Sequence, residues 1–163
     1  RRRSPCTPDT TQQMNIEGAS ILVTGGAGLI GSSTIDMLLE QHKPERIVIY
    51  DDLSRGSKRN IARTLGDPRV TFVEADICDV PAFRRACHGM DAVYHFAALR
   101  ITACAADPRR AMQVMCEGTF NVVDAATQAG VKKIVAASSA AVYAMAQSFP
   151  TREDPPPYAN RPW

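Results

Sequence analysis

Three glycines at fixed spacing follow a run of strand-forming residues near the start of the chain. The segment ILVTGGAGLIG covers 21–31, and its spaced glycines are Gly25, Gly28 and Gly31. Glycine at such positions permits a tight turn, lets backbone approach a pyrophosphate and allows a helix to pack close to the strand. The next helix would offer free N–H groups and partial positive charge to the phosphates. The segment therefore predicts a dinucleotide-binding turn.

An acidic pair stands at the end of the next predicted strand. Asp51 lies twenty residues past Gly31, close to the separation expected for a carboxylate that binds the adenosine ribose. A carboxylate accepts hydrogen bonds from the 2′- and 3′-hydroxyls and repels a 2′-phosphate, which favours NAD over NADP. Arg55 keeps NADP open as an alternative, and Asp52 is the alternative ribose ligand. The non-functional interpretation of Asp51 is a solvated turn acid.

Two further strand ends carry candidate cofactor contacts. Asp76, in the segment EADI, stands where a carboxylate could accept a hydrogen bond from the adenine amino group; the alternative is a loop acid that caps the following turn. The small side chains of Ala97 and Ala98, in HFAAL, would let backbone lie close to the cofactor. We interpret His95 as a packing histidine, because no carboxylate stands beside it to support acid–base chemistry.

Two serines follow the last predicted strand, in the segment ASSAAVY at 137–143. Ligands bind at the carboxyl edge of open parallel sheets, so these hydroxyls could bond a substrate hydroxyl or carbonyl. No G-x-S-x-G sequence surrounds them, which argues against hydrolase chemistry. No cluster of His, Cys and Asp has metal-ligand spacing, so we expect no metal site.

Alternating strand and helix patterns must position these residues. The predicted strands are 20–24, 46–50, 70–74, 91–95 and 133–137, and the predicted helices are 28–41, 57–65, 80–88 and 107–128. Asp107 and Pro108 begin the last helix, and Gly130 ends it. Strands separated by helices predict a parallel sheet with right-handed crossovers. The fold class is thus α/β, a Rossmann-type doubly wound sheet that looks truncated after about the fifth strand.

Composition bounds the function classes. The 163 residues carry a net charge of +2, but the three arginines at 1–3 and Asp9 account for it, so residues 14–163 sum to zero. A neutral body gives no electrostatic reason to expect a nucleic-acid or membrane partner. No apolar run approaches the roughly 18–20 residues of a transmembrane helix. Five cysteines without a C-x-x-C pair argue against a disulfide framework and favour a reducing, cytoplasmic location.

The two ends of the chain differ from the body between them. Residues 1–13 are polar, basic and without apolar periodicity, so we expect a disordered tail or leader. Residues 14–163 would form one incomplete NAD(P)-binding Rossmann domain. Five of the eleven prolines lie in 150–163, which predicts an extended loop there.

Six segments together resemble one family. They are TGGAGLIG at 24–31, YDDLSRG at 50–56, EADI at 74–77, HFAALR at 95–100, EGTFNVVDAA at 117–126 and AASSAAVY at 136–143. In this order and spacing they resemble the N-terminal portion of the extended short-chain dehydrogenases/reductases, specifically the NAD-dependent sugar-nucleotide epimerase/dehydratase family. The resemblance covers about residues 19–163 and implies NAD as cofactor and a nucleotide sugar as substrate. It also implies that residues 14–163 lack the C-terminal substrate lobe of the family.

The resemblance also assigns roles to particular residues. The implied pyrophosphate ligands are Gly25, Gly28, Leu29, Ile30 and Gly31. The implied adenosine ligands are Asp51, Asp76 and Ile77, and the implied nicotinamide-side residues are Ala97, Ala98 and Arg100. Ser139 matches the catalytic Ser/Thr of the family, which hydrogen-bonds the sugar hydroxyl that is oxidised.

Two departures from the family pattern matter. Met115 stands where the family often has Asn, which removes one polar contact. The catalytic Tyr-x-x-x-Lys is absent, because neither Tyr143 nor Tyr158 has a lysine four residues later. By family spacing that tyrosine would fall about one residue after Trp163. A phenol with a pKa of about 10 is a poor base at neutral pH unless a neighbouring ammonium stabilises its phenolate.

The expected whole protein is a sugar-nucleotide epimerase, dehydratase or decarboxylase that transiently oxidises a sugar hydroxyl. The family implies a homodimer for the full-length enzyme, and the chain alone is expected to be inactive. Two alternatives stay open: a non-catalytic NAD-binding regulatory module, and a one-way dehydrogenase/reductase on the same scaffold.

Overall fold

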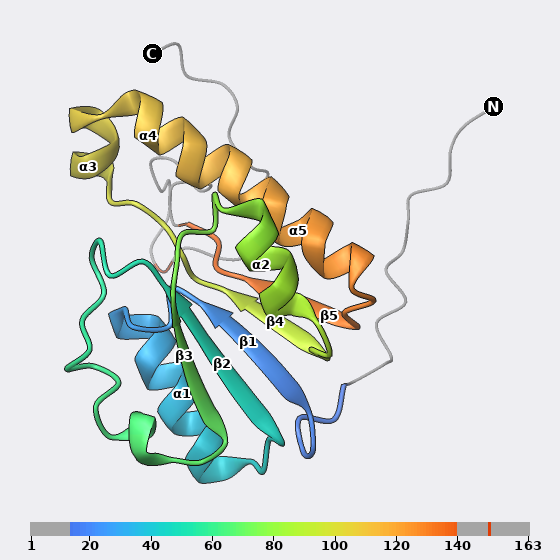
Figure 1. Ribbon diagram of the computed structural model, residues 1–163. Helices are drawn as coiled ribbons and strands as arrows, with labels where there is room; N and C mark the ends of the chain where they lie inside the picture. Colours follow the sequence, from blue (N-terminus) through green and yellow to red (C-terminus); the bar gives the residue numbers. More distant parts are fainter. Residues whose placement is uncertain (1–13, 140–149, 151–163) are drawn as a thin grey trace.

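The computed structural model describes residues 14–139 and Pro150, and these form a five-stranded sheet (Figure 1). The strands are β1 (Ser20–Thr24), β2 (Arg46–Asp51), β3 (Val70–Glu74), β4 (Ala92–His95) and β5 (Lys133–Ala136). Their order across the sheet is β3-β2-β1-β4-β5, and every neighbouring pair is parallel. This order changes direction at β1, where open α/β sheets bind their ligands. The predicted strands and their parallel pairing are confirmed.

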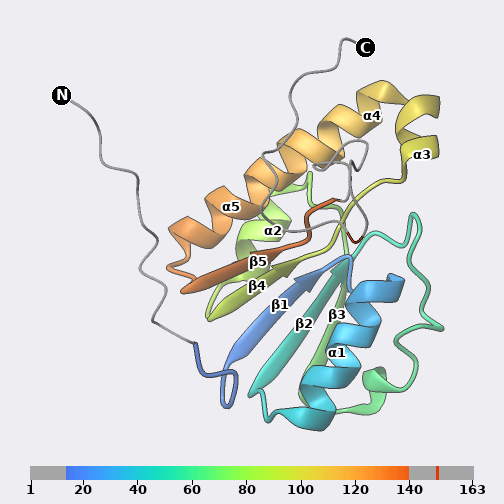
Figure 2. The same cartoon turned by 180° about the vertical axis from the view of Figure 1, so that it is seen from behind.

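Helices cover both faces of this sheet. They are α1 (Leu29–Gln41), η1 (Thr64–Gly66), α2 (Val80–Cys87), α3 (Ile101–Ala106), α4 (Pro108–Met112), the π-helical segment η2 (Gln113–Gly118) and α5 (Thr119–Gln128). In Figures 1 and 2, α1 lies against one face of the sheet. The other face is covered by α2 and by the consecutive helical segments α4, η2 and α5 (residues 108–128), which we call the α4–α5 rod. The sheet is therefore doubly wound, as predicted.

The central strand shows why the chain folds in this way. All five residues of β1 are buried, as expected for a parallel strand that is covered on both faces. Ile21 and Val23 belong to the cluster that packs under α1. Leu22 belongs to the opposite cluster, together with Phe83 of α2 and Val122 of α5. The alternation of side chains along β1 thus places one core on each side of the sheet.

Two helical predictions need correction. Residues 57–65 do not form a helix; turns lead into the 3₁₀ segment η1 instead. The backbone amides of this segment bond three residues back, from Asn60 to Ser57 and from Thr64 to Ile61, and the Asn60 side chain bonds to the carbonyl oxygen of Ala27. The helix α3 was not predicted, and the helix predicted over 107–128 contains the π-helical segment η2 in its middle.

The predicted ends of the last helix are confirmed. The Asp107 carboxylate accepts a hydrogen bond from the backbone N–H of Arg110 at 2.9 Å, and Pro108 occupies the first turn. Gly130 adopts a left-handed conformation, with a φ of +73°, just beyond α5. Within the described part of the chain, no helix is both long and apolar enough to cross a membrane.

Candidate dinucleotide-binding site

A cavity of about 600 Å³ opens where the strands end. The eleven residues predicted to bind the cofactor all line it: Gly25, Gly28, Leu29, Ile30, Gly31, Asp51, Asp76, Ile77, Ala97, Ala98 and Arg100. They come from the carboxyl ends of four strands: the turn after β1 with the first residues of α1, the last residue of β2, and the turns after β3 and β4. The fold therefore gathers in one place the residues that the motifs singled out, in a volume typical of small-molecule sites.

The glycine turn leaves no room for side chains at two of its positions. Gly25 has a φ of +66°, and a Cβ on it would lie 2.7 Å from the backbone nitrogen of Ala97. A Cβ on Gly31 would meet the carbonyl oxygen of Gly25 and lie 2.6 Å from the Cα of Gly26. The backbone of the glycine turn is therefore packed against the backbone of the turn after β4 and against its own backbone. This cradle has the shape that a close backbone approach to a ligand requires.

Helix α1 begins directly above the cradle. Its N-cap is Gly28, and neither a side-chain cap nor an acidic residue satisfies its first turn. The side chains of Leu29 and Ile30 are 80% and 62% exposed. A helix end with uncapped N–H groups and no neighbouring acid attracts an anion, because the backbone dipoles place partial positive charge there.

Asp51 lies at the floor of the cavity and is 7% exposed. Its Oδ2 accepts a hydrogen bond from the Ala27 amide at 3.0 Å, and its Oδ1 accepts one from the Leu53 amide at 2.8 Å. Burial raises the pKa of this carboxyl, while the two amide hydrogen bonds oppose the shift. Leu53 is held at a φ of 56°, a costly conformation for leucine. Asp51 therefore ties the β2 turn to the glycine turn.

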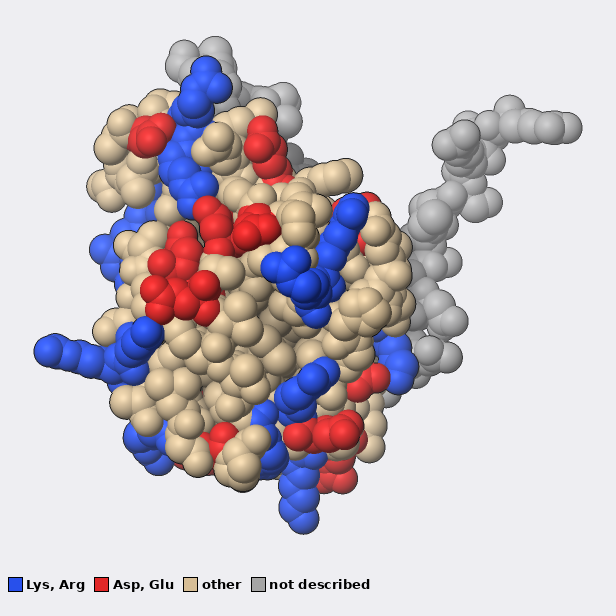
Figure 3. All heavy atoms as spheres, viewed as in Figure 1, with Lys and Arg blue, Asp and Glu red and all other residues tan. Residues whose placement is uncertain are grey.

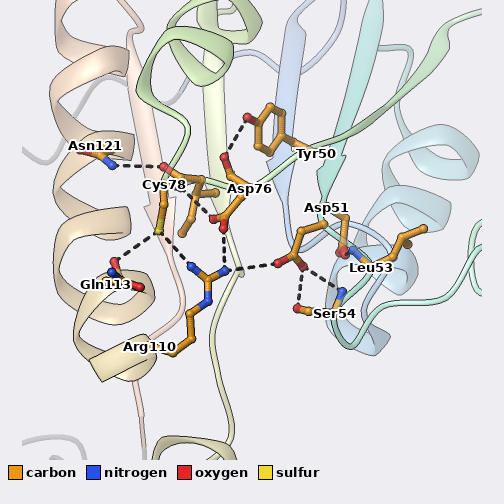
Figure 4. Close-up of polar contacts among 11 residues, drawn as sticks. Tyr50, Asp51, Leu53, Ser54, Asp76, Cys78, Arg110, Gln113 and Asn121 are labelled. Atoms are coloured by element: carbon orange, nitrogen blue, oxygen red, sulfur yellow. Dashed lines mark hydrogen bonds and ion pairs between the residues drawn. The ribbon is translucent and has the colours of Figure 1, made fainter. Parts of the chain in front are cut away.

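Asp76 lies on the other side of the cavity and is bound differently (Figure 4). Its Oδ1 accepts a hydrogen bond from the Cys78 amide at 2.8 Å, and its Oδ2 lies 2.6 Å from Nη2 of Arg110. Burial alone would raise the pKa of Asp76, but the hydrogen bonds from Cys78 and Arg110 outweigh it, so the pKa is lowered. The carboxylate is therefore ionised at neutral pH.

Tyr50 supports the Asp76 turn from beneath. Its hydroxyl donates to the carbonyl oxygen of Asp76 at 3.1 Å, and its ring meets the ring of Phe83 edge-on at 5.1 Å. Burial, followed by the nearby charges of Asp79 and Asp76, raises the pKa of Tyr50 to about 12. The phenol stays neutral and acts as a hydrogen-bond donor, which fixes the backbone at the end of β3.

His95 is the packing histidine that the sequence indicated. It is buried, and its Nδ1 lies 2.7 Å from the Thr24 hydroxyl while its Nε2 lies 3.2 Å from the Thr119 hydroxyl. Burial lowers its pKa, so the ring is neutral at pH 7. The Thr24 hydroxyl also accepts a hydrogen bond from the Ala97 amide at 3.3 Å. His95 thus connects β1, the turn after β4 and α5.

Met115 partly replaces the amide that the family pattern often has. Its sulfur accepts a hydrogen bond from the Leu99 amide at 3.2 Å. A thioether is a weak acceptor, but it still gives the turn after β4 a contact with the rod that carries α4 and α5. The loss of polarity at this position therefore does not leave the Leu99 amide without a partner.

Ser139 is the last residue of the described stretch 14–139. It follows β5 by three residues, at the same carboxyl edge of the sheet, and is exposed. It is not among the described residues that line the cavity. Tyr143, Tyr158 and the predicted tail at 1–13 lie outside the described residues. Among residues 14–139, no group of three or more His, Cys, Asp or Glu side chains could hold a metal ion.

Charge is unevenly distributed around the site. Figure 3 shows acidic side chains gathered on the surface over the region where the strands of Figure 1 end. Three aspartates line the cavity, Asp51, Asp52 and Asp76, together with the two arginines Arg55 and Arg100. Carboxylates accept hydrogen bonds from hydroxyl and amino groups and repel additional phosphates. The aspartates therefore favour a ligand that presents hydroxyl and amino groups at this end of the cavity.

The sheet order, the glycine turn and the acid at the end of β2 define a class: the chain is a Rossmann-type dinucleotide-binding domain. The model of the NAD dependent epimerase/dehydratase family matches residues 21–163. The chain belongs to this family.

Two curated relatives of known type are similar to this chain in sequence. The chain is 39% identical over 149 residues to UDP-glucose 4-epimerase of Bacillus subtilis, covering 88% of this chain and 43% of the relative. It is 36% identical to dTDP-glucose 4,6-dehydratase of Streptomyces griseus, covering 88% of this chain and 44% of the relative. The chain thus spans less than half the length of these curated relatives.

A solved structure agrees with the fold. UDP-glucose-4-epimerase from Stenotrophomonas maltophila, with bound NAD and formylated UDP-arabinopyranose, matches with a TM-score of 0.77 and 33% identity. The match covers 87% of this chain and 43% of that one.

Proposed function

We propose that this chain binds NAD in the cavity at the carboxyl edge of its sheet. The observation that carries the proposal is that all eleven residues selected from sequence motifs line one cavity of about 600 Å³. The pyrophosphate would lie on the cradle around Gly25, Gly28 and Gly31, where the closely packed backbone leaves no room for a Cβ at Gly25 or Gly31. Leu29 and Ile30 would offer their amides from the first turn of α1.

The adenosine half would lie between two aspartates. Asp51 accepts one amide hydrogen bond on each oxygen, so each keeps a lone pair for a ribose hydroxyl. Asp76 would accept from the adenine amino group, with Ile77 against the ring. A 2′-phosphate would meet the carboxylates of Asp51 and Asp52, so we propose NAD rather than NADP.

The nicotinamide half would lie beside Ala97, Ala98 and Arg100, in the turn that Thr24 and His95 hold. When bound, NAD supplies a hydride acceptor. Ser139 would orient the sugar hydroxyl that loses its hydrogen. The chain has no Tyr-x-x-x-Lys to take the proton, so we expect no turnover from residues 1–163 by themselves.

The whole protein is proposed to be a sugar-nucleotide epimerase, dehydratase or decarboxylase. Support comes from relatives that are named as UDP-glucose 4-epimerases and a dTDP-glucose 4,6-dehydratase. We also propose a cytoplasmic location, which is supported by the free thiols of the described cysteines Cys78, Cys87, Cys104 and Cys116.

A homodimer is proposed for the whole protein because apolar side chains stand exposed along the α4–α5 rod. Met112, Phe120 and Val123 are 58%, 68% and 46% exposed. Exposed apolar side chains along one rod suit a helical subunit interface.

Calorimetric titration of the chain with NAD and NADP tests the proposed function. We expect NAD to bind and NADP to bind much more weakly, because of the carboxylates at the ribose position. An absence of NAD binding would contradict the proposal. A second assay, with NAD and a panel of UDP- and dTDP-sugars, should show no conversion; robust conversion would disprove the inactivity of the chain.

A further inference from the structure

Arg110 connects the two acidic turns on one side of the cavity (Figure 4). Its Nη2 lies 2.6 Å from Oδ2 of Asp76 and 3.6 Å from Oδ2 of Asp52. Its Nη1 lies 3.7 Å from the sulfur of Cys78. The guanidinium of Arg110, which belongs to α4, therefore contacts both the turn after β2 and the turn after β3.

The helix that carries Arg110 is itself fixed in place. The Asp107 carboxylate caps α4 by accepting a hydrogen bond from the Arg110 amide. One turn further on, Val114 lines the cavity, and Gly118 packs so closely on Ile77 that a Cβ would lie 2.6 Å from its Cδ1. One face of this rod thus forms the wall that touches Asp76 and Ile77.

This contact determines which way the Asp76 carboxylate faces. One oxygen accepts from the Cys78 amide and the other from Arg110, so the plane of the carboxylate is set by two partners on different elements. A charge-assisted hydrogen bond at 2.6 Å is among the stronger side-chain contacts. Without it, the carboxylate would keep one anchor and could rotate about its side-chain bonds.

We propose that Arg110 is the positioning residue for adenine recognition. It orients the remaining lone pairs of Asp76 toward the exocyclic amino group of the adenine, and so gives the site its preference for a 6-amino purine. The inference rests on the proposed NAD site. Nothing in the sequence motifs assigns this role, because Arg110 lies 34 residues from Asp76 and outside the motif segments.

The test compares NAD with nicotinamide hypoxanthine dinucleotide, which has an oxygen in place of the amino group. Calorimetric titration of the wild-type chain should show tighter binding of NAD. Arg110→Ala should weaken NAD binding by about fivefold, the effect of about one hydrogen bond, and should change binding of the hypoxanthine analogue by less than about twofold. Arg110→Lys should retain an intermediate preference, because lysine keeps the charge without the fork of donors.

Arg109→Ala is the matched control, because it removes a neighbouring exposed arginine from the same helix and should leave both affinities unchanged. If Arg110 had only a structural role, Arg110→Ala would weaken the binding of both dinucleotides equally. That result would overturn the inference. An unchanged affinity for NAD would overturn it as well. If Arg110→Ala fails to fold by circular dichroism, the same two titrations on Arg110→Lys decide. Failure of the wild-type chain to bind either dinucleotide would instead contradict the proposed NAD site.

Discussion

The two walls of the cavity are held by different kinds of contact. In the wall formed by β1, β2 and α1, the carboxylate of Asp51 bonds to the backbone amides of Ala27 and Leu53. In the wall formed by β3 and α4, Asp76 is held partly by the side chain of Arg110. Backbone donors are fixed once the local fold forms, whereas a long side chain must be ordered by packing. The first wall is therefore set by local geometry and the second by tertiary contact.

Burial separates the two walls further. Asp51 is 7% exposed, but the side chains of Arg110 and Asp76 are 34% and 32% exposed. Water screens a partly exposed ion pair, so its loss costs little stability, while the loss of a buried acceptor leaves donors unsatisfied. Changes to the first wall should therefore affect folding and binding together. Changes to the second should affect mainly binding.

The largest effect is expected from Gly31→Ala in the first wall. The new Cβ would meet backbone atoms of Gly25 and Gly26, which cannot move without opening the turn. The free energy of unfolding should fall by about 3 kcal/mol, measured by urea denaturation. Gly66→Ala is the control, since nothing lies within 4 Å of its Cβ position. Equal denaturation midpoints for the two variants would show that the cradle is not closely packed.

Asp51→Ala should come next. It leaves the amides of Ala27 and Leu53 without their acceptor, so the free energy of unfolding should fall by about 2 kcal/mol. NAD affinity should fall too, and the discrimination against NADP should relax. Asp51→Asn keeps one acceptor and should lose less stability. If Asp51→Ala binds NAD as well as the wild type in calorimetry, the ribose assignment is wrong.

His95 connects β1 of the first wall to α5, and its protonation should weaken this connection. Burial lowers its pKa in the folded state, so below the ordinary value of about 6.5 the unfolded chain takes up the proton first. Stability should therefore be full above that pH and fall as the pH drops through the lowered folded pKa, with a slope of at most about 1.4 kcal/mol per pH unit from this group.

The measurement is urea denaturation as a function of pH for the wild type and for His95→Gln. The glutamine variant lacks the titrating ring, so its stability should depend less on pH over the same range. An identical pH dependence for the two proteins would assign the acid sensitivity to another group.

Gly118→Ala in the second wall should have the smallest effect on stability. Its Cβ would lie 2.6 Å from Cδ1 of Ile77, the movable end of a side chain. The free energy of unfolding should change by less than about 1 kcal/mol, because alanine also favours the helix. NAD affinity should fall by about threefold as Ile77 is pushed toward the cavity. Adding Ile77→Val should restore binding, and a double variant no better than the single one would contradict this explanation.

The same contrast explains what could be predicted from the sequence. The five strands and α1 were predicted to within one residue, because glycine spacing and apolar periodicity are local signals. The role of Arg110 could not be predicted, since its contact with Asp76 depends on how α4 packs over the end of β3. The prediction of a helix at 57–65 was wrong, because the turn there is held by hydrogen bonds to Ala27, which is far away in the sequence and leaves no local signal.

The π-helical segment Gln113–Gly118 changes which residues of the α4–α5 rod lie on the same side of it. Residues four apart along it face the site or the core: Arg110, Val114, Gly118, Val122 and Ala126. In an α-helix of 3.6 residues per turn, each such step drifts by about 40°, so a row of five would wind by about 160°. The wider turn of Gln113–Gly118 takes back part of that drift.

The length of this segment should therefore matter more than its exposed side chains. Deleting one residue from it would rotate the start of the rod by roughly 100° relative to α5 and carry the guanidinium away from Asp76. Substitutions at its exposed positions leave the rotation of the rod relative to α5 unchanged. The segment acts as a fixed spacer, and among close relatives of this chain insertions and deletions should be rarer there than replacements.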